Sequence, residues 1–325
     1  MRRREFIALL GCAAAVGPVA AHAQPSMPVI GFLNVGTADG YAAMVATFHQ
    51  GLNDVGFVVG QNVVIEYRWA DGRYDQLPTL ADDLIRRRVA VIAGNLPAAM
   101  VAKAATASIP IVFSAGSDPI ESGLVASLGR PGGNVTGVTS LANELGPKRM
   151  AMLRELVPNA ATMAALVNPN NNRNAEIQLR DLRMAAASLA LQIHALPTGS
   201  EHDFAAAFDE AVRLRVAAVV ISADPLFNAW SERLAALAVE RRLPATHQYR
   251  EFAAAGGLMS YGTSIVENYR LVGNYVGRIL KGGKPAELPV QQSSKIEFVI
   301  NLKTAQRLGL AVPHTVRMLA NEVIE

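Results

Sequence analysis

The sequence predicts an α/β protein built from two Rossmann-like lobes with parallel sheets. After residue 28, short β-branched runs alternate with longer amphipathic stretches, and this alternation starts again near residue 143. Each parallel connection needs a crossover, so such an alternation indicates a parallel sheet covered by helices on both faces. A chain of 325 residues is also too long for one small core and fits two domains of about 150 residues each.

The first half holds five strand-helix units. Val45, Phe48 and Leu52 recur at helical spacing after the first strand, and Leu80 and Leu84 do so after the second. The expected strands are 29–33, 63–69, 91–93, 111–114 and 135–138. The expected helices are 41–55, 74–88, one from residue 98 and one from residue 120.

The second half repeats this order, and no low-complexity linker separates it from the first. The expected helices are 145–156, 174–189, 203–214, 230–240, 266–280 and 302–308. The expected strands are 163–167, 192–195, 218–222, 245–246, 257–261 and 297–300, with a loop at 281–289. Short ordinary connections of this kind predict two joined lobes.

The N-terminus predicts export. Arg3 and Arg4 form a twin-arginine pair, an uncharged run extends to Ala21, and Ala23 completes a small-residue cleavage site. We expect residues 1–23 to be a twin-arginine export signal that is cleaved after Ala23, which places the mature protein in the periplasm. Processing as a lipoprotein at Cys12 is the less favoured alternative, because the apolar stretch before it is short. A basic N-terminus buried in a cytosolic core is disfavoured by the cost of burying arginines.

Charge and cysteine content exclude several classes of function. Without residues 1–23 the chain carries 27 basic and 26 acidic residues, so no nucleic acid is expected as a partner. The single cysteine, Cys12, lies inside the predicted signal. The mature chain therefore has no thiol for catalysis or for a thiolate metal site.

No catalytic or cofactor motif stands out. The run from Lys281 to Lys284 is basic and rich in glycine, but no strand precedes it and no Ser or Thr follows it. The histidines are scattered, so no metal site is expected. Asp82 and Asp83 lie beside Arg86 and Arg87, where ion pairing on an exposed helix face is the ordinary interpretation. These observations favour a binding protein without cofactor or metal over an enzyme.

Three strand ends carry an Asp or Asn directly before a proline: Asn168, Asp118 and Asp224. A side-chain acceptor followed by proline is typical of a helix start, so capping alone accounts for each of them. All three also fall where a parallel strand leads into its helix, and ligands of open α/β sheets bind at that edge. Both interpretations stay open for each residue.

Several stretches together resemble the exported substrate-binding proteins of ABC transporters, in particular the family whose best-understood members capture aromatic amino acids. The resemblance extends from about residue 28 to the C-terminus. It is carried by residues 28–33, 48–52, 60–63, 66–70, 109–113, 130–137, 256–262 and 300–305.

This resemblance implies a type I periplasmic-binding-protein fold with a ligand between two lobes and a hinge of three crossings. Lobe one is expected at 27–142 plus 263–290, and lobe two at 143–262 plus 291–325. The crossings are expected near Ser140, Thr263 and Gln291. The implied function is capture of an amino acid or an aromatic or carboxylated solute by hinge closure, for delivery to a membrane permease. A periplasmic ligand sensor and an α/β enzyme acting on a small metabolite remain alternatives.

The ligand is expected to meet loops at the ends of strands that face the cleft. In lobe one these residues are Gly36, Thr37, Asn95, Leu96, Ser114, Ala115 and Asp118. In lobe two they are Asn168, Asn170, Asn171, Asn172, Asp224, Phe227 and Tyr261. Backbone amides at helix starts suit a carboxylate, Asp118 or Asp224 suits an ammonium group, and Phe227 or Tyr261 suits an aromatic ring. Asn95-Leu96-Pro97 stands where family members commonly have small Gly or Thr residues, so the identity of the ligand stays open.

Overall fold

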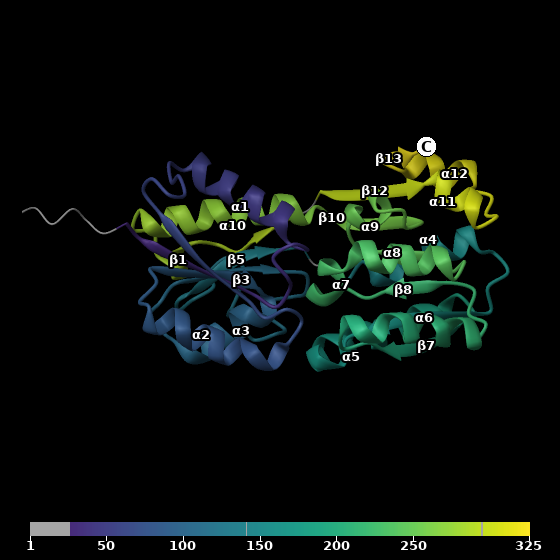
Figure 1. Ribbon diagram of the computed structural model, residues 1–325, viewed down its shortest axis with the longest axis horizontal. Helices are drawn as coiled ribbons and strands as arrows, with labels where there is room; N and C mark the ends of the chain where they lie inside the picture. The colour runs from purple at the N-terminus through teal and green to yellow at the C-terminus, as the bar shows by residue number, and fades with distance from the viewer. Residues whose placement is uncertain (1–26, 141, 294) are drawn as a thin grey trace, which may run out of the picture.

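The computed structural model describes residues 27–140, 142–293 and 295–325. The predicted export signal and Cys12 lie outside the described residues. Figure 1 shows two lobes side by side along the long axis, each with its own sheet between helices. The sheets are mainly parallel, so the predicted α/β architecture with two Rossmann-like lobes is confirmed.

The first lobe is built on a six-stranded, wholly parallel sheet with the order β11-β5-β4-β3-β1-β2. Its strands are β1 (Val29–Asn34), β2 (Val64–Trp69), β3 (Val91–Asn95), β4 (Ile111–Ala115), β5 (Val135–Thr139) and β11 (Gln291–Gln292). Its helices are α1 (Ala42–Asp54), α2 (Leu77–Arg86), α3 (Leu96–Ala105) and α10 (Ile265–Leu280), with 3₁₀ turns at η1 (Tyr74–Gln76) and η4 (Pro285–Glu287). Helices α1 and α10 cover one face, and α2 and α3 cover the other.

The second lobe has a seven-stranded sheet with the order β13-β12-β10-β9-β8-β6-β7. Its strands are β6 (Thr162–Val167), β7 (Gln192–Pro197), β8 (Val219–Ile221), β9 (Ala245–His247), β10 (Met259–Thr263), β12 (Ile296–Asn301) and β13 (Glu322–Ile324). Its longer helices are α4 (Gly146–Leu156), α5 (Asn172–Ser188), α6 (Phe204–Arg213) and α8 (Ser231–Glu240). Shorter helical segments are α7 (Pro225–Ala229), α9 (Arg250–Ala254), α11 (Leu302–Arg307), α12 (His314–Leu319), η2 (Pro169–Asn171) and η3 (Glu201–Asp203).

The chain passes between the two sheets three times, as a hinge of three crossings requires. The passages lie between β5 and α4, between β10 and α10, and between β11 and β12. Gln291 and Gln292 still pair with β5, so the third passage follows Gln292.

Close packing of two helices assigns α10 to the first lobe, although the strand before it belongs to the second sheet. A side chain at Gly51 of α1 would collide with the carbonyl oxygen of Arg270, and one at Gly273 would collide with that of Phe48. The two glycines therefore let the helix backbones meet directly. This contact fixes the start of α10, with Ile265 and Tyr269, next to the ends of the first sheet's strands.

Two expectations about the elements need correction. No helix follows Ile120 in the described residues: the chain from Pro119 forms turns. Asp118 Oδ1 accepts a hydrogen bond from the amide of Ile120, and Gly123 then adopts a left-handed φ of +77°, which ends any helical course. The second sheet is also not wholly parallel, because β12 runs antiparallel to β10. Strand β10 leaves toward the hinge and β12 returns from it, so the two run in opposite directions.

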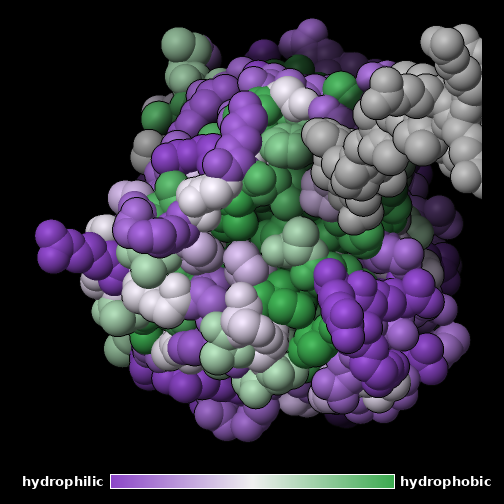
Figure 2. Space-filling view, turned by 90° about the vertical axis from the view of Figure 1, so that its left-hand side faces the viewer, coloured by the Kyte–Doolittle hydropathy of each residue, from purple (hydrophilic) through white to green (hydrophobic). Residues whose placement is uncertain are grey.

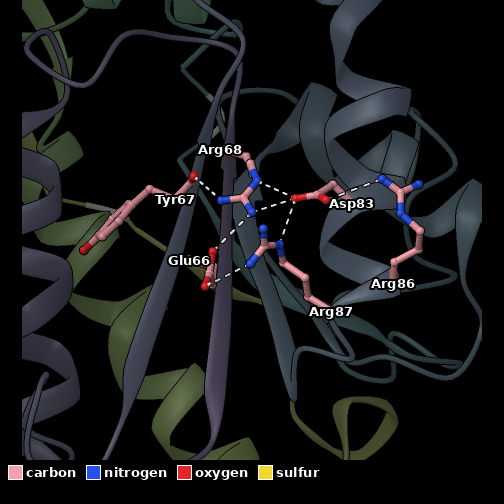
Figure 3. Close-up of polar contacts among 6 residues, drawn as sticks. All are labelled: Glu66, Tyr67, Arg68, Asp83, Arg86 and Arg87. Carbon is pink, nitrogen blue, oxygen red and sulfur yellow. Dashed lines mark hydrogen bonds and ion pairs between the residues drawn. The ribbon is translucent and has the colours of Figure 1, made fainter.

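A cluster of charged residues ties the edge strand β2 to helix α2 (Figure 3). Asp83 Oδ2 accepts hydrogen bonds from Arg68 Nε at 2.8 Å and Arg87 Nε at 3.1 Å, and Arg68 also bonds Glu66. Hydrogen bonding to Arg68, more than any other contact, lowers the pKa of Asp83. This carboxylate is therefore ion-paired, as the sequence indicated.

The far end of the first lobe is the face opposite to the second lobe. Figure 2 shows apolar residues gathered in the middle of this face and hydrophilic residues around them. The carboxyl ends of the strands of this sheet lie at the other end of the lobe, where the chain passes to the second lobe.

Candidate functional site

A small cavity lies where the ends of the two sheets meet, and we call it the deep chamber. Its volume is about 50 Å³, which is room for about four water molecules. The first lobe lines it with Tyr41, Asn95, Leu96, Pro97, Ser114, Gly116, Ser117, Ile265 and Tyr269. The remaining lining residues are Asn143, Asn171, Asn174, Ala223, Asp224, Pro225, Asn228, Gln248 and Tyr249. The polar side chains of the wall are amides, hydroxyls and one carboxylate, contributed from both sides.

A wider cavity of about 390 Å³ shares lining residues with the deep chamber, and we call it the outer chamber. The shared residues are Leu96, Pro97, Ser117, Asn143, Asn171 and Asn174. Met100 and Ile177 add apolar surface. Burial, together with Asp118, Asp181 and Glu121, raises the pKa of Glu144 at this cavity. The outer chamber therefore combines apolar surface with a charged rim. The rim holds four carboxylates and two guanidinium groups, those of Asp118, Glu121, Glu144, Asp181, Arg173 and Arg180.

Asn34, at the end of β1, organises the first lobe's side of the site. Its Nδ2 donates to the hydroxyl of Tyr269 at 3.0 Å, while its Oδ1 accepts from the amide of Gly36 at 2.8 Å and from Asn95 Nδ2 at 2.7 Å. All members of this Asn34 cluster, namely Asn34, Gly36, Asn95 and Tyr269, come from the first lobe. Asn95 also caps helix α3 by accepting from the amide of Ala98. The side chains are therefore fixed before any ligand arrives.

Asp224 organises the opposite wall. Its Oδ1 accepts from Tyr74 Oη at 2.7 Å, from Asn168 Nδ2 at 2.9 Å and from the amide of Leu226 at 2.9 Å. Its Oδ2 accepts from Asn171 Nδ2 at 2.9 Å. Burial raises the pKa of Asp224, and the hydrogen bonds oppose that rise. Tyr74 belongs to the first lobe, so this Asp224 cluster bridges the two lobes.

The tyrosines around the chamber are neutral hydrogen-bonding groups. Burial raises the pKa of Tyr41, Tyr249 and Tyr269 well above the usual value for a phenol. Tyr41 and Tyr269 meet edge to face with ring centroids 5.9 Å apart. Tyr41, Tyr249 and Tyr269 all line the deep chamber.

One acceptor at the chamber wall has no partner. Gln248 Nε2 donates to Asn228 Oδ1 at 2.8 Å, but Gln248 Oε1 has no hydrogen bond among the described residues although the residue is 2% exposed. A buried acceptor without a partner costs free energy, and a ligand donor in the chamber would remove that cost.

The structure brings some of the predicted ligand residues together. Asn95, Leu96, Ser114, Asn171 and Asp224 line the deep chamber, and Asp118 lines the outer chamber. Asn168 lies directly behind the wall, where it donates to Asp224.

Two predicted aromatic residues do not line the deep chamber. Phe227 is buried against Phe204 in the core of the second lobe, at a centroid distance of 6.2 Å, and Tyr261 packs edge to face on Phe298. Neither ring lines the chamber, because each points into the layers of its own sheet.

Five further predicted positions do not line the deep chamber either. Gly36 and Ala115 are buried behind it, and Thr37 caps the turn to Gly40. Asn170 donates to the carbonyl of Gly199 on an outer surface. Asn172 begins helix α5 as an exposed residue.

Several lining residues lie outside the set predicted from the sequence. Tyr41 begins the stretch after β1, Asn228 follows the cap at Asp224, and Gln248 and Tyr249 directly follow β9. The rule that ligands meet the carboxyl ends of parallel strands applies to β9 as well. Applied to every strand, it points to Gln248 and Tyr249. Tyr269 lies inside a helix, where the spacing gives no such signal.

The site offers hydrogen bonding and one carboxylate, which suits binding of a polar group. Among the described residues, no three His, Cys, Asp or Glu side chains lie close enough to hold a metal ion. No helix in the described part of the chain is long and apolar enough to cross a membrane.

Comparison with known proteins decides the family. The family described as "ABC transporter substrate binding protein" matches residues 29–324. This chain belongs to that family. It is thus the solute-binding component of an ABC transporter and not an enzyme. Members of this family are typically extracytoplasmic. The expected fold and class of function are thereby confirmed.

Relatives of this binding protein include one whose ligand is named. The tyrosine-binding protein of Clostridioides difficile (strain R20291) is 24% identical over 264 residues, which is 81% of this chain and 75% of the relative. The solved structure of an ABC domain in complex with L-Trp, from Streptococcus pneumonia, has a TM-score of 0.81 at 25% identity and covers 92% of this chain and 100% of that one. A conserved domain protein from Vibrio cholerae O1 biovar El Tor has a TM-score of 0.82 at 23% identity, covering 91% and 99%.

Proposed function

We propose that this binding protein traps an aromatic amino acid, or a solute of similar size and polarity, between its lobes and delivers it to a membrane permease. The observation that carries the proposal is the deep chamber, whose polar wall comes from both lobes and is bridged by Tyr74 and Asp224. A ligand that contacts both walls favours the arrangement in which the lobes meet. Relatives that bind tyrosine and L-Trp support the solute class.

The two connected cavities suggest how such a solute lies. The deep chamber has room for a small polar head but not for an aromatic ring, whereas the outer chamber has about 390 Å³ and the apolar side chains Met100 and Ile177. We place the head group near Asn95, Ser114 and Asp224, and the ring toward the outer chamber. Asp118 then lies near the ring end of the solute and does not contact its head.

The proposal includes the division of the chain and its export. We assign 27–142 plus 264–292 to lobe one, and 143–263 plus 293–325 to lobe two, because Thr263 belongs to β10 and Gln291 and Gln292 pair with β5. The contact of α10 with α1 supports placing 265–280 in lobe one.

Residues 1–23 are proposed to be a twin-arginine signal cleaved after Ala23, which delivers the protein to the periplasm, and lipidation at Cys12 is the less favoured route. Size analysis of the mature protein by mass spectrometry distinguishes the two.

Calorimetry and thermal unfolding with L-tryptophan, L-tyrosine and a simple sugar test the proposal. At 100 times its dissociation constant, a true ligand adds about 2.7 kcal/mol to the free energy of unfolding. The variant Ser114→Phe, which fills the deep chamber, is expected to abolish binding, whereas Ser108→Phe on an exposed loop is expected to bind normally. If neither amino acid binds the wild type, or if Ser114→Phe binds as the wild type does, the proposal is wrong.

A further inference from the structure

Arg149 of helix α4 is a buried cation without an acidic partner. Its side chain is 0% exposed, and none of the ion pairs among the described residues includes it. Burial lowers the pKa of Arg149 to about 10, so the side chain is still charged at neutral pH. A buried charge that meets no opposite charge is costly to a folded protein. Such a group therefore calls for an explanation.

The guanidinium lies directly behind the wall of the deep chamber. Nη1 donates to the carbonyl oxygens of Ala142 at 3.0 Å and Tyr261 at 3.3 Å. Ala142 precedes Asn143, which lines the chamber. The charge of Arg149 also acts on Tyr249, another lining residue. Burial raises the pKa of Tyr249, a hydrogen bond with Ser140 lowers it, and the charges of Glu251 and Arg149 act on it in opposite directions. Arg149 Nε has no hydrogen bond among the described residues.

The groups next to the guanidinium do not neutralise its charge. Burial first, and the charge of Arg149 second, lower the pKa of His247 to about 3, so this histidine is neutral. Tyr249 is also neutral, since burial raises its pKa well above the usual value. Both oxygens that accept from Arg149 are uncharged backbone carbonyls. The charge of Glu251 also acts on Tyr249, but Glu251 forms no ion pair with Arg149 among the described residues, so the guanidinium has no opposite charge in contact with it.

The chamber thus has opposite charges at two walls. Asp224 is the only charged side chain among its lining residues, and Arg149 lies behind the wall that holds Asn143 and Tyr249. We propose that the solute is a zwitterion, and that Arg149 is a positioning residue that compensates the charge of its carboxylate from behind this wall. The ammonium group then faces Asp224. This inference rests on the proposed function, because it requires that the head group lies in the deep chamber.

Because the guanidinium of Arg149 lies behind the wall, it acts on the carboxylate of the solute without contacting it directly. In this proposal the carboxylate accepts hydrogen bonds from donors that line the chamber, and the guanidinium stabilises it through a medium of low polarity, where charges interact more strongly than in water. A solute with the same ring and ammonium group but no carboxylate gains nothing from Arg149.

Matched ligands test this assignment. Calorimetry compares L-tryptophan with tryptamine, and L-tyrosine with tyramine, on the wild type and on Arg149→Met, Arg149→Lys and Lys148→Met. Lys148 precedes Arg149 on the same helix and is exposed, so Lys148→Met removes an equal charge without touching the chamber. Thermal unfolding and circular dichroism establish that each variant is folded.

Arg149→Met is expected to weaken binding of the amino acids at least tenfold and binding of the amines less than twofold. Arg149→Lys keeps the preference for amino acids over amines, and it serves as the deciding variant if Arg149→Met does not fold. Lys148→Met leaves all affinities unchanged. Equal losses for amino acid and amine would show a merely structural role and overturn the inference, while solute binding itself would stand. If the wild type binds none of the four compounds, the proposed function fails and the inference fails with it.

Discussion

Each wall of the deep chamber is organised by one side chain that hydrogen-bonds several neighbours, but the two walls differ in where those neighbours come from. In the Asn34 cluster a neutral amide at the end of β1 satisfies Gly36, Asn95 and Tyr269, which all belong to one lobe. In the Asp224 cluster a carboxylate after β8 satisfies four donors, and one of them, Tyr74, comes from the other lobe. The first wall is therefore complete in a single lobe, whereas the second is complete only when the lobes meet.

This difference assigns different tasks to the walls. A self-contained cluster holds its side chains in place whether the lobes are together or apart. A cluster that includes a bond across the hinge changes when they separate, so its free energy is coupled to closure. The polar surface of lobe one is thus preformed. The bond between Tyr74 and Asp224, in contrast, depends on closure of the lobes.

The largest effect is expected from Asp224→Ala. Four donors, including the side chains of Asn168 and Asn171, lose their buried acceptor. The free energy of unfolding is expected to fall by about 3 kcal/mol, measured by urea denaturation. Asn34→Ala removes a neutral amide and is expected to cost about 2 kcal/mol. Glu176→Ala, which removes an exposed carboxylate of α5, is the control and is expected to cost little. An Asn34→Ala loss larger than that of Asp224→Ala would reverse the ranking of the two walls.

A smaller effect, specific to closure, is expected from Tyr74→Phe. It removes the bond across the hinge at a cost of about 1 kcal/mol, so the ligand-free protein opens more and the affinity for solute falls about fivefold. Tyr269→Phe removes a bond of similar kind inside lobe one, and it is expected to leave the separation of the lobes unchanged. X-ray scattering without ligand compares the two variants. The same radius of gyration for both would remove Tyr74 from the closing mechanism.

The smallest effect is a pH dependence of the free energy of unfolding, which is expected for the Asp224 cluster and not for the Asn34 cluster. Burial raises the pKa of Asp224 in the folded protein, so the folded state takes up this proton at a higher pH than the unfolded state does. As the pH falls through the folded-state pKa toward the unfolded value, the wild type therefore gains stability relative to Asp224→Asn. As the pH rises through that window, the gain is lost. Urea denaturation of both proteins at a series of pH values measures the difference. Asn34→Ala is expected to differ from the wild type by the same amount at every pH.

The sequence predicted the lobes well and the site partly. Alternating strands and helices gave both sheets, and strand ends gave Asn95, Ser114 and Asp224, because the carboxyl ends of parallel strands share one edge. Two elements were predicted wrongly, because the alternation of strands and helices was assumed to continue without exception. Asp118 and Gly123 form a turn where the repeating order suggested a helix, and β12 enters its sheet from the hinge and so runs antiparallel to β10.

The sequence by itself determined the α/β class, the twofold repetition of the pattern, the absence of cysteine beyond Cys12 and the family resemblance, because all of these depend on local periodicity and composition. Only the tertiary structure decided which polar residues meet. Tyr74 and Asp224 are 150 positions apart, Asn34 and Tyr269 are 235 apart, and Arg149 reaches the carbonyl of Tyr261 across 112. Such contacts arise from the three passages between the lobes and from the direct packing of α10 on α1, and no spacing along the chain records them.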